Sequence, residues 1–490
     1  MPIIKVNRDK LFTQISTIFF VPIRVIRVLF LYFVQALINP FVLIRVIRVF
    51  HLHLKQTLNF SFPPLLKSLS ASFFCLILFH QITIGQENKF DISGFARIDH
   101  YFTFKYYKDP IINERNQGLL QANISKKFID KIKIFTALEF RGDLSAPSRN
   151  RIYPKEYYVN LSLKSFDFRI GKQIYFWGRA DGVNVTNNIC PVDYTDFLDA
   201  DDEKIGQLSL NTKYYLKNWT LQGVYIPFFS TSILPVKNSI WNLPLPAVIE
   251  SPCGKYFIPV FNYLPDYAPD KNLKNGQYAF KLDKQGSGFD LSTSYYHGYS
   301  HLPEITKSFS FLNFDSVKVN IQKNYLPKDI IGFDFATTLG KFGIRGEGAY
   351  FMTSGKQAKL IKYQYDYLQY ALGVDFRKDI NNNNFYFIVQ WMQEIVPSGN
   401  KYPLTSFNHL FQKSLLARVE FNSRNILSAS MQALYDFEFK DYYLRPHINY
   451  KIFDGLELSL IGDILNGDDR SLFGIYKFND RIQMKAKYSF

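Results

Sequence analysis

The last eleven residues, 480–490, alternate between apolar and polar side chains. The apolar positions are Ile482, Met484, Ala486, Tyr488 and Phe490, and the polar positions between them are Arg481, Gln483, Lys485, Lys487 and Ser489. A period of two residues is typical of a β-strand with one apolar and one polar face. A charged face on such a strand suits a barrel wall that has lipid outside and water inside. An edge strand of a soluble sheet is the alternative, and the rest of the chain favours the barrel.

The same alternation recurs through the chain and predicts about eighteen antiparallel strands. We expect them at 90–107, 117–128, 131–141, 156–164, 167–177, 206–216, 218–228, 276–283, 287–298, 329–339, 342–354, 363–378, 384–395, 413–422, 425–437, 441–452, 455–465 and 476–490. Tight connections alternate with longer ones, as short periplasmic turns alternate with longer outer loops in outer-membrane barrels. The sequence therefore predicts an all-β protein, a transmembrane outer-membrane β-barrel with long outer loops.

The composition supports this fold class. Aromatic residues make up 17% of the 490 residues, with 33 Tyr and 48 Phe. A soluble core does not need so much tyrosine, whereas barrels place its ring in lipid and its hydroxyl in the interfacial belt. After residue 90, no apolar run approaches the ~20 residues that a membrane helix needs. A membrane protein made from this sequence therefore crosses with strands.

The beginning of the chain differs from the rest. Residues 56–86 are interpreted as a signal-peptide region, with a charge at Lys67, an apolar stretch at 71–79 and cleavage near Gln86, ahead of a single barrel at 87–490. Residues 1–55 form a basic, apolar extension that twice contains Ile-Arg-Val-Ile-Arg-Val. This extension is either an over-extended start or a basic inner-membrane anchor.

Three predicted connections are long, at about 178–205, 229–275 and 299–328. Loops of this length are usually functional or disordered. Cys190 in the first loop and Cys253 in the second lie on the same outer side, so they could form a disulfide in an oxidising compartment. Two free thiols are the alternative. Residues 309–322 could be another strand, but they lack a clean partner and are assigned to the third loop.

The densest motif runs from Arg169 to Gly182 and continues to Asp193. It resembles the alginate-export family and related uncharacterised outer-membrane barrels, in which Gly-x-Gln and Trp-Gly lead into a loop with Asp and Pro. The matching residues are Gly171, Gln173, Trp177, Gly178, Asp181, Gly182, Pro191 and Asp193. The resemblance implies an eighteen-stranded barrel that passes an anionic polysaccharide or another solute. The inward residues here are mixed in charge, unlike the strongly basic alginate pore.

The end of the chain carries a second resemblance. Tyr488 and Phe490 resemble the C-terminal targeting strand of Gram-negative outer-membrane barrels, which ends in Phe. This resemblance implies recognition by the barrel-assembly machinery and residence among outer-membrane lipids.

We predict that Trp177, Arg179, Asp181 and Asp193 form the pore entrance. The predicted pore lining consists of inward-facing polar residues: Arg97, Asp99, Glu139, Arg141, Asp167, Arg169, Gln173, Arg345, Glu347, Arg418, Glu420 and Arg445. Five pairs of opposite charge stand two residues apart on one strand face. Such pairs could orient a polar solute through a transverse field. They could instead form a fixed salt-bridge network that stiffens the lumen.

The function that fits these patterns best is a porin-like channel for diffusion or export of a polar solute, with anionic and saccharide solutes both in view. A surface-binding or structural barrel closed by its long loops is the alternative. A barrel hydrolase using His297 or His301 is a third hypothesis, but no Gly-x-Ser-x-Gly or His-Glu-x-x-His motif is present, so no enzyme activity is expected. No metal-ligand spacing or cofactor motif occurs. The net charge is +16, yet no arginine-rich run predicts nucleic-acid binding.

Overall fold

The computed structural model describes residues 90–103, 112–128, 130–145, 147–199, 204–235, 239–242, 245–251, 253–353, 365–397, 399, 409, 412–469 and 471–490. The chain divides into two units, 1–75 and 76–490, and the described residues all belong to the second. The expected segments 1–55 and 56–86 therefore lie outside the described residues. None of the helices in the described ranges has the length and hydropathy that a membrane-spanning helix needs.

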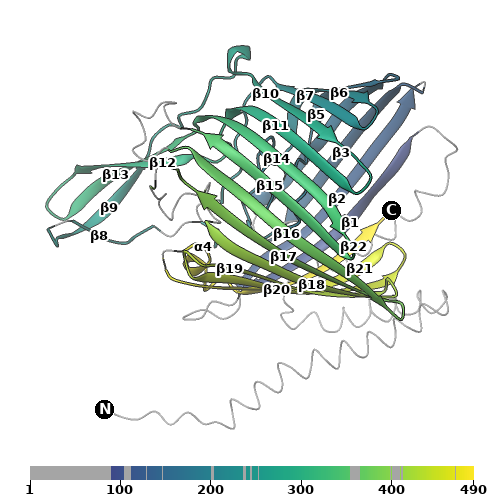
Figure 1. The fold of residues 1–490 in the computed structure, drawn as a ribbon. Coiled ribbons are helices and arrows are strands. Elements are labelled where there is room, and N and C mark those ends of the chain that lie inside the picture. Colours follow the sequence, from purple (N-terminus) through teal and green to yellow (C-terminus); the bar gives the residue numbers. More distant parts are fainter. Residues whose placement is uncertain are drawn as a thin grey trace, which may run out of the picture. The chain divides into compact units, whose positions relative to one another are not determined.

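Eighteen strands in the described part of the chain form one closed antiparallel sheet, a β-barrel (Figure 1). They are β1 (Asp91–Thr103), β2 (Ile112–Phe128), β3 (Ile132–Asp143), β4 (Arg151–Ser162), β5 (Phe166–Gln173), β6 (Gln207–Leu216), β7 (Trp219–Ile226), β10 (Gln277–Lys284), β11 (Phe289–Tyr299), β14 (Pro327–Leu339), β15 (Phe342–Met352), β16 (Tyr367–Ile380), β17 (Asn383–Ile395), β18 (Lys413–Ser423), β19 (Leu427–Asp436), β20 (Asp441–Phe453), β21 (Leu456–Asn466) and β22 (Arg481–Ser489). Each strand corresponds to one of the predicted strands, so the predicted fold class is confirmed.

The last strand closes the barrel against the first. β22 pairs antiparallel with β1, from Phe95↔Ser489 to Thr103↔Arg481. The pairing ends at Phe490, whose backbone exchanges two hydrogen bonds with Gly94, at 2.9 and 3.0 Å. The predicted alternation of β22 is present: its polar positions from Arg481 to Lys485 are at most 7% exposed, while Met484 is 50% exposed.

The outer face of the wall is apolar. Large hydrophobic side chains on it are roughly half exposed, among them Ile170, Phe280, Phe333, Leu372 and Leu458. They come from strands all around the barrel, so they form a surface far larger than the isolated patches that soluble monomers expose. Charged pairs of the wall, such as Arg97 with Asp99 and Arg141 with Glu139, are buried on the other face, toward the lumen.

The tight turns have the backbone conformations that short hairpins need. Asn381 and Asn382 have φ values of 45° and 66°, and they join β16 to β17. Positive φ at both central residues is the geometry of the primed turns, whose twist matches that of the flanking strands. The predicted turns at Gly340 and Gly455 also have positive φ.

A second sheet stands outside the wall and contains β8 (Ile249–Glu250), β9 (Tyr256–Tyr263), β12 (Glu304–Phe311) and β13 (Ser316–Asn324) (Figure 1). The placement of 309–322 outside the wall is therefore right, but its assignment as a loop is wrong. Its strand β13 has a parallel partner, β9, that lies in a different connection and could not be found from local alternation.

The remaining elements are short. They are two turns of 3-10 helix, η1 (Pro147–Arg149) and η2 (Leu273–Asn275), and one turn of α-helix, α4 (Leu472–Ile475). The predicted last strand thus begins five residues late, at Arg481 and not at residue 476, because the connection before it folds into a capped turn. Ser471 caps α4 by accepting a hydrogen bond from the Gly474 amide at 3.0 Å.

The orientation of the wall can be tested with two neighbouring residues on β21. Leu458 is on the apolar outer face, whereas Ser459 donates to Asn449 at 2.8 Å on the lumen side. Leu458→Arg should lower the free energy of unfolding from phospholipid vesicles by about 2–4 kcal/mol, because it places a charge in hydrocarbon. Ser459→Arg is the control and should cost less than half as much in the same denaturant titration. Equal losses would contradict the assigned faces.

Candidate functional site

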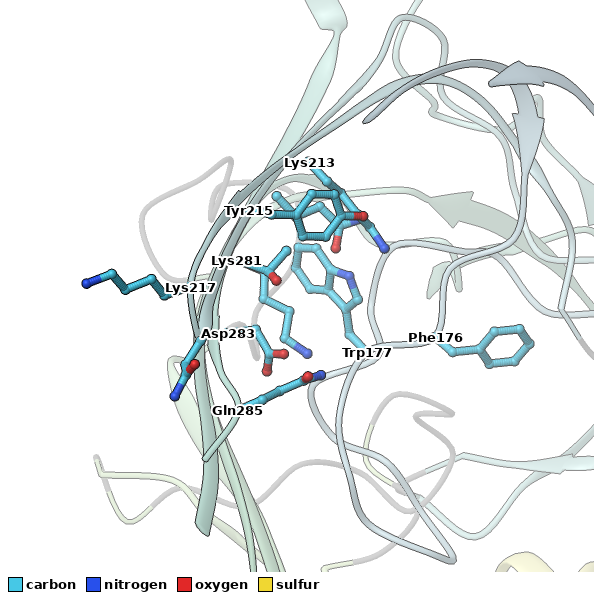
Figure 2. Close-up of a pocket in the computed structure, with 11 residues that line it drawn as sticks. Phe176, Trp177, Lys213, Tyr215, Lys217, Lys281, Asp283 and Gln285 are labelled. Atoms are coloured by element: carbon cyan, nitrogen blue, oxygen red, sulfur yellow. The ribbon is translucent and has the colours of Figure 1, made fainter. Parts of the chain in front are cut away.

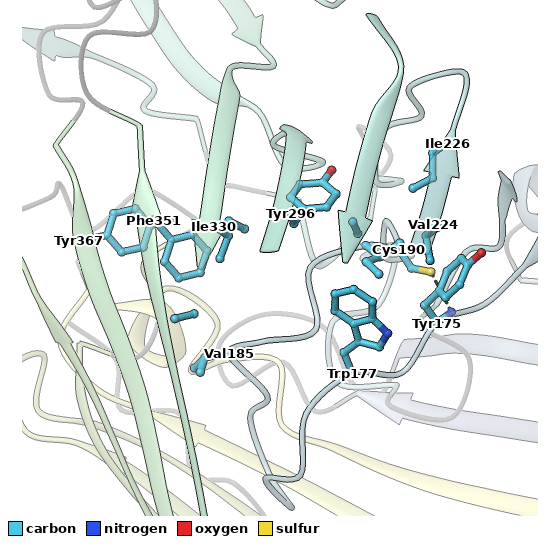
Figure 3. Packing of buried hydrophobic residues seen from close by; sticks show 13 residues of the cluster. Tyr175, Trp177, Val185, Cys190, Val224, Ile226, Tyr296, Ile330, Phe351 and Tyr367 are labelled. Atoms are coloured by element: carbon cyan, nitrogen blue, oxygen red, sulfur yellow. Dashed lines mark hydrogen bonds between the residues drawn. The ribbon is translucent and has the colours of Figure 1, made fainter. Parts of the chain in front are cut away.

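The connection after β5 folds into the barrel, and we name its described part, residues 174–199, the inward loop. Figure 3 shows Tyr175, Trp177, Val185 and Cys190 of this loop packed against side chains of the wall. The wall residues come from one arc of adjacent strands, β7 to β16, and among them are Val224, Ile226, Tyr296, Ile330, Phe351 and Tyr367. The loop is therefore part of the core of the protein and not an open outer loop.

The first residues of the inward loop are fixed by hydrogen bonds that end the strand. The Ile174 amide donates to Glu156 Oε1 at 2.8 Å, and the Tyr175 amide donates to Cys190 Sγ at 3.2 Å. Gly178 follows with φ of +94°, and a side chain there would collide with Asn184 and Glu347. Only glycine therefore fits the bend that turns the chain away from the wall.

Glu347 of β15 holds the middle of the inward loop. Its carboxylate accepts hydrogen bonds from the amides of Arg179, Ala180 (2.5 Å) and Thr186 (3.2 Å), and from the Thr186 hydroxyl (3.1 Å). Glu347 is 3% exposed. A buried carboxylate that takes several N–H groups makes strong, charge-assisted hydrogen bonds. The predicted pairing of Glu347 with Arg345 is therefore wrong, because loop amides occupy the carboxylate.

Two charged side chains of the loop reach the wall. Arg179 pairs with Asp283 at 2.5 Å and with Asp334. Asp181 pairs with Arg345, which also lies 3.3 Å from Asp375. Partial burial raises the pKa of Asp181 above its ordinary value, and the charge of Asp375 adds to this effect while Arg345 opposes it.

The far part of the inward loop is anchored by a buried ionic cluster. Asp196 lies 2.9 Å from Arg115 and 2.7 Å from Arg481, and Asp199 lies 2.6 Å from Arg115. Lys485 is 3.7 Å from Asp199. Burial alone would raise the pKa of Asp196, but Arg481 and Arg115 hold it below its ordinary value. This anchor is thus fully present above the ordinary pKa of about 4 and weakens only as pH falls through the lower folded-state value.

Arg115 is not among the predicted lining residues, because it precedes the expected strand 117–128. It belongs to β2, whose first residue is Ile112. The alternation of the terminal strand does place Arg481 on the inward, polar face. Neither residue could be paired with Asp196 from sequence, because the partners are far apart in the chain.

The predicted entrance residues do not form one group. Arg179 and Asp181 cross to the wall, whereas Trp177 is 4% exposed inside the apolar cluster. Asp193 is also buried, at 8% exposure, and it pairs with Arg151 at 3.0 Å. Trp177 and Asp193 therefore support the loop, and Arg179 and Asp181 are the members that carry charge across the lumen.

Several predicted lining pairs form as expected. Arg97 pairs with Asp99 at 2.9 Å, Arg141 pairs with Glu139 at 3.0 Å, and Arg418 pairs with Glu420. The first two pairs are at most 7% exposed, while the side chain of Arg418 is 38% exposed. The lumen thus contains both buried pairs and pairs that solvent reaches.

Other predicted lining residues have different partners. Asp167 accepts a hydrogen bond from the Tyr215 hydroxyl at 2.8 Å, and Arg169 donates to Asn160 at 3.1 Å, so the predicted pair of Asp167 with Arg169 is not formed. Gln173 is fully buried and donates to the Ser209 carbonyl at 3.0 Å. Arg445 donates to the Leu198 carbonyl of the inward loop at 2.7 Å.

Cys190 and Cys253 are free thiols, so of the two alternatives the free thiols are right and the possible disulfide is absent. Cys190 is buried at the base of the inward loop and Cys253 is exposed beside β9. Burial raises the pKa of the Cys190 thiol to about 11. Cys190 thus acts as a packing residue that accepts a hydrogen bond from Tyr175.

A cavity of about 380 Å³ lies between the inward loop and strands β6, β7 and β10 (Figure 2). Its lining is Phe176, Trp177, Lys213, Tyr215, Lys217, Asn218, Thr220, Gln222, Lys281, Asp283 and Gln285. Phe176 is 74% exposed and points away from the wall. The expected strand 167–177 included Phe176, but β5 ends at Gln173, so Phe176 is not part of the wall.

Two other connections also enter the lumen. Trp241 is 1% exposed and packs on Phe197 of the inward loop and on Tyr476, with ring centroids 4.8 and 5.5 Å apart. The Tyr476 hydroxyl donates to the Trp241 carbonyl at 2.9 Å. The second long connection therefore touches the inward loop through Trp241.

The two histidines of the hydrolase hypothesis have separate positions. His301 is 7% exposed, and its ring nitrogens lie 2.8 and 3.1 Å from the carbonyls of Ser230 and Ile189. Burial lowers the pKa of His301 to about 4, so it is neutral, and its single N–H can donate to only one of these two carbonyls. His297 lies 2.6 Å from Asp329. The hydroxyl of Ser300 donates to the Leu302 carbonyl.

These features define a class of protein: a closed antiparallel barrel with an apolar exterior and a charged lumen crossed by an anchored loop. Residues 98–358, more than half of the chain, match a family described as "Protein of unknown function (DUF1302)", and the chain belongs to this family. The resemblance to the alginate-export family is not confirmed by this match. No curated protein sequence matched the chain.

Several solved structures are similar in fold. OccK2 (OpdF) of Pseudomonas aeruginosa aligns over 82% of this chain and 98% of its own, with 9% identity and a TM-score of 0.48. OccAB4 of Acinetobacter baumannii aligns over 83% and 99%, with 11% identity and a TM-score of 0.47. A loop-deletion mutant of OmpT, an outer membrane protein of Vibrio cholerae, aligns over 82% and 100%, with 10% identity and a TM-score of 0.41. At these values the likeness concerns general architecture, and nothing about solute or mechanism follows.

The role of Glu347 can be tested by amide hydrogen exchange. Glu347→Ala removes the acceptor for three loop amides, so protection at Arg179, Ala180 and Thr186 should fall at least tenfold, which is about 1.4 kcal/mol. Glu420→Ala is the matched control, because it removes a lumenal carboxylate that pairs with Arg418. Unchanged protection in the Glu347 variant would show that other contacts suffice to hold the loop.

Proposed function

We propose that this protein is an outer-membrane channel for small polar solutes, in which the inward loop forms the constriction. The observation that carries the proposal is the loop itself, whose Arg179 and Asp181 pair with charged residues of the wall inside a closed barrel. A charged loop held across a lumen narrows a pore and presents fixed charges to whatever passes.

The proposed location rests on the two faces of the wall. The exterior is apolar on all sides and the interior is charged, which is the arrangement of a barrel with lipid outside and water inside. The C-terminal strand with Tyr488 and Phe490, and the signal region expected at 56–86, point to export and to the barrel-assembly machinery. Outer-membrane lipid and that machinery are the partners we propose.

The charged pairs of the lumen divide into two groups with different proposed roles. Arg97 with Asp99, which are buried, stabilise the wall and the packing around the loop. Asp181 with Arg345 have side chains 27% and 30% exposed, so they act on solutes in water. The two alternatives for the charged pairs thus apply to different parts of one lumen. Solvent-accessible pairs create a transverse field that acts on solutes, and buried pairs form a fixed salt-bridge network. Polar saccharides and organic ions are the solute classes that such a lining suits.

A surface-binding barrel is the second candidate, and the external sheet favours it. The hairpin of β12 and β13 exposes Phe309, Phe311 and Phe314 at 58%, 80% and 100%. Exposed aromatic groups of this kind are typical of interaction sites. A barrel with this function would be closed by its loops and would carry no current in a planar bilayer.

Conductance tests the channel proposal and its constriction. The purified protein should form channels in planar bilayers, and replacing both Arg179 and Asp181 by Ala should raise single-channel conductance by half or more, because the loop loses two attachments. Arg377→Gln with Asp379→Asn is the control, since it removes an exposed pair of opposite charges beside a turn and leaves the net charge unchanged. Absence of wild-type channels would favour the surface-binding barrel.

Ion preference should depend on pH through Asp181. Burial raises the pKa of Asp181, so its carboxylate loses its charge at a higher pH than an ordinary aspartate, whose pKa is about 4. Arg345, Asp375, Tyr386 and Arg418 surround it. Cation preference, measured as a reversal potential in a salt gradient, should therefore weaken as pH is lowered from 8 to 4. Asp181→Asn should flatten this profile, and an unchanged profile would contradict the assignment.

A further inference from the structure

We infer that a subsite for the anionic group of a small solute lies at the edge of the chamber beneath the inward loop. It is formed by Lys213 of β6, which lines the chamber, and by Arg169, which lies diagonal to Lys213 on the neighbouring strand β5. The inference rests on the proposed channel function and names the chemistry that this part of the lumen recognises. It starts from a difference between Arg169 and the other arginines of the wall.

The other lumen-facing strand arginines are compensated. In the described part of the chain each has a carboxylate oxygen within 4 Å, and they are Arg97, Arg115, Arg141, Arg151, Arg345, Arg377, Arg418, Arg445 and Arg481. Arg169 has no such partner among the described residues. The nearest candidate in sequence, Asp167, is hydrogen-bonded to Tyr215.

Arg169 is fixed in place while its two Nη groups remain available to donate hydrogen bonds to a solute. Its Nε donates to Asn160 at 3.1 Å, and its guanidinium lies over the ring of Tyr158 at 4.2 Å from the centroid. Tyr158 is stacked in turn on Phe135, with centroids 5.0 Å apart. The two Nη groups make no described hydrogen bond. A planar guanidinium fixed by stacking presents these groups as a fork, which matches the geometry of a carboxylate or phosphate.

Lys213 supplies the second positive charge. It is directly opposite Asp167 and diagonal to Arg169, so Lys213 and Arg169 share one face at about 7–8 Å between side-chain origins. No carboxylate oxygen of the described chain lies within 4 Å of its ammonium. Figure 2 shows its nitrogen directed to the lumen side of the wall, beside Tyr215. Two carboxylates act on Lys213, but Asp167 is hydrogen-bonded to Tyr215 and Asp283 is paired with Arg179 at 2.5 Å. Arg169 and Lys213 therefore leave this part of the wall with a local excess of positive charge.

The chamber has room for a small molecule beside these cations. Its volume of about 380 Å³ lies within the range of small-ligand pockets. Asn218, Thr220, Gln222 and Gln285 contribute amides and a hydroxyl to the lining. A solute with one oxyanion and several hydroxyl groups therefore fits the chemistry. Carboxylates and phosphates share the oxyanion, and the test separates them.

The test uses three hexoses that differ only in their charged group: glucuronate, glucose 6-phosphate and glucose. Each is added to wild-type channels in planar bilayers, and block of the potassium chloride current is titrated. Both anionic sugars, or one of them if the site selects its oxyanion, should block at concentrations at least tenfold lower than glucose. Arg169→Gln with Lys213→Gln should raise those blocking concentrations at least tenfold.

Two controls make the result specific. Lys217→Gln removes a lysine of the same chamber that points to the opposite side of the wall from Lys213 in Figure 2, so it should change block less than twofold. Arg169→Lys with Lys213→Arg keeps both charges, and it should retain anion preference if folding is intact by heat-modifiable migration. Equal block by glucose, or block by the anions that the double Gln variant leaves unchanged, would overturn the subsite. Because wild-type conductance is measured in the same experiment, failure of the channel itself is a separate outcome.

Discussion

Closure of the wall between its first and last strands is the constraint on which the rest of the protein depends. β22 pairs with β1 along its length, so every strand of the described wall has two neighbours and its backbone groups are satisfied within the sheet. An apolar surrounding demands this, because it offers no water to unpaired N–H and C=O groups. Closure also creates an interior, and the charged strand faces can be hydrated or paired only there. The anchored loop, the ionic clusters and the chamber all follow from having such an interior.

The fold could be predicted from sequence because the wall is a local pattern. Period-two alternation depends on neighbours two residues apart, and it is interrupted at each turn by residues such as Asn381 that tolerate positive φ. The same rule failed after Gln173, where Ile174 and Phe176 continue the alternation but the chain leaves the wall. There the amides of Ile174 and Tyr175 donate hydrogen bonds to Glu156 and Cys190 instead of to a neighbouring strand. The alternation of apolar and polar residues does not indicate these partners.

Many residues of the candidate site could be predicted from the sequence, but several of their interaction partners could not. Charges two residues apart on one strand find each other when nothing else competes, as Arg97 and Asp99 do. The rule fails where the inward loop supplies a better partner. Glu347 accepts hydrogen bonds from the amides of residues more than 160 positions earlier in the chain. Because Glu347 is occupied in this way, Arg345 pairs with Asp181 instead. Asp196 could not be joined to Arg115 and Arg481 before the loop was known to turn inward. Long-range partners of this kind depend on the closed shape, which the local sequence does not encode.

The ionic cluster at Asp196 and Asp199 has a consequence for the order of assembly. Two of its cations, Arg481 and Lys485, belong to β22, the last strand of the described wall, and a third, Arg115, belongs to β2 near the beginning of the barrel. The inward loop can therefore reach its final seat only when the seam between the two ends of the chain has formed. Until then its two aspartates have only Arg115 of these three cations, and the lumen stays open to water. The inward loop thus takes its final position only in a closed barrel. In a barrel that has not closed, the loop does not fill the interior, which stays hydrated.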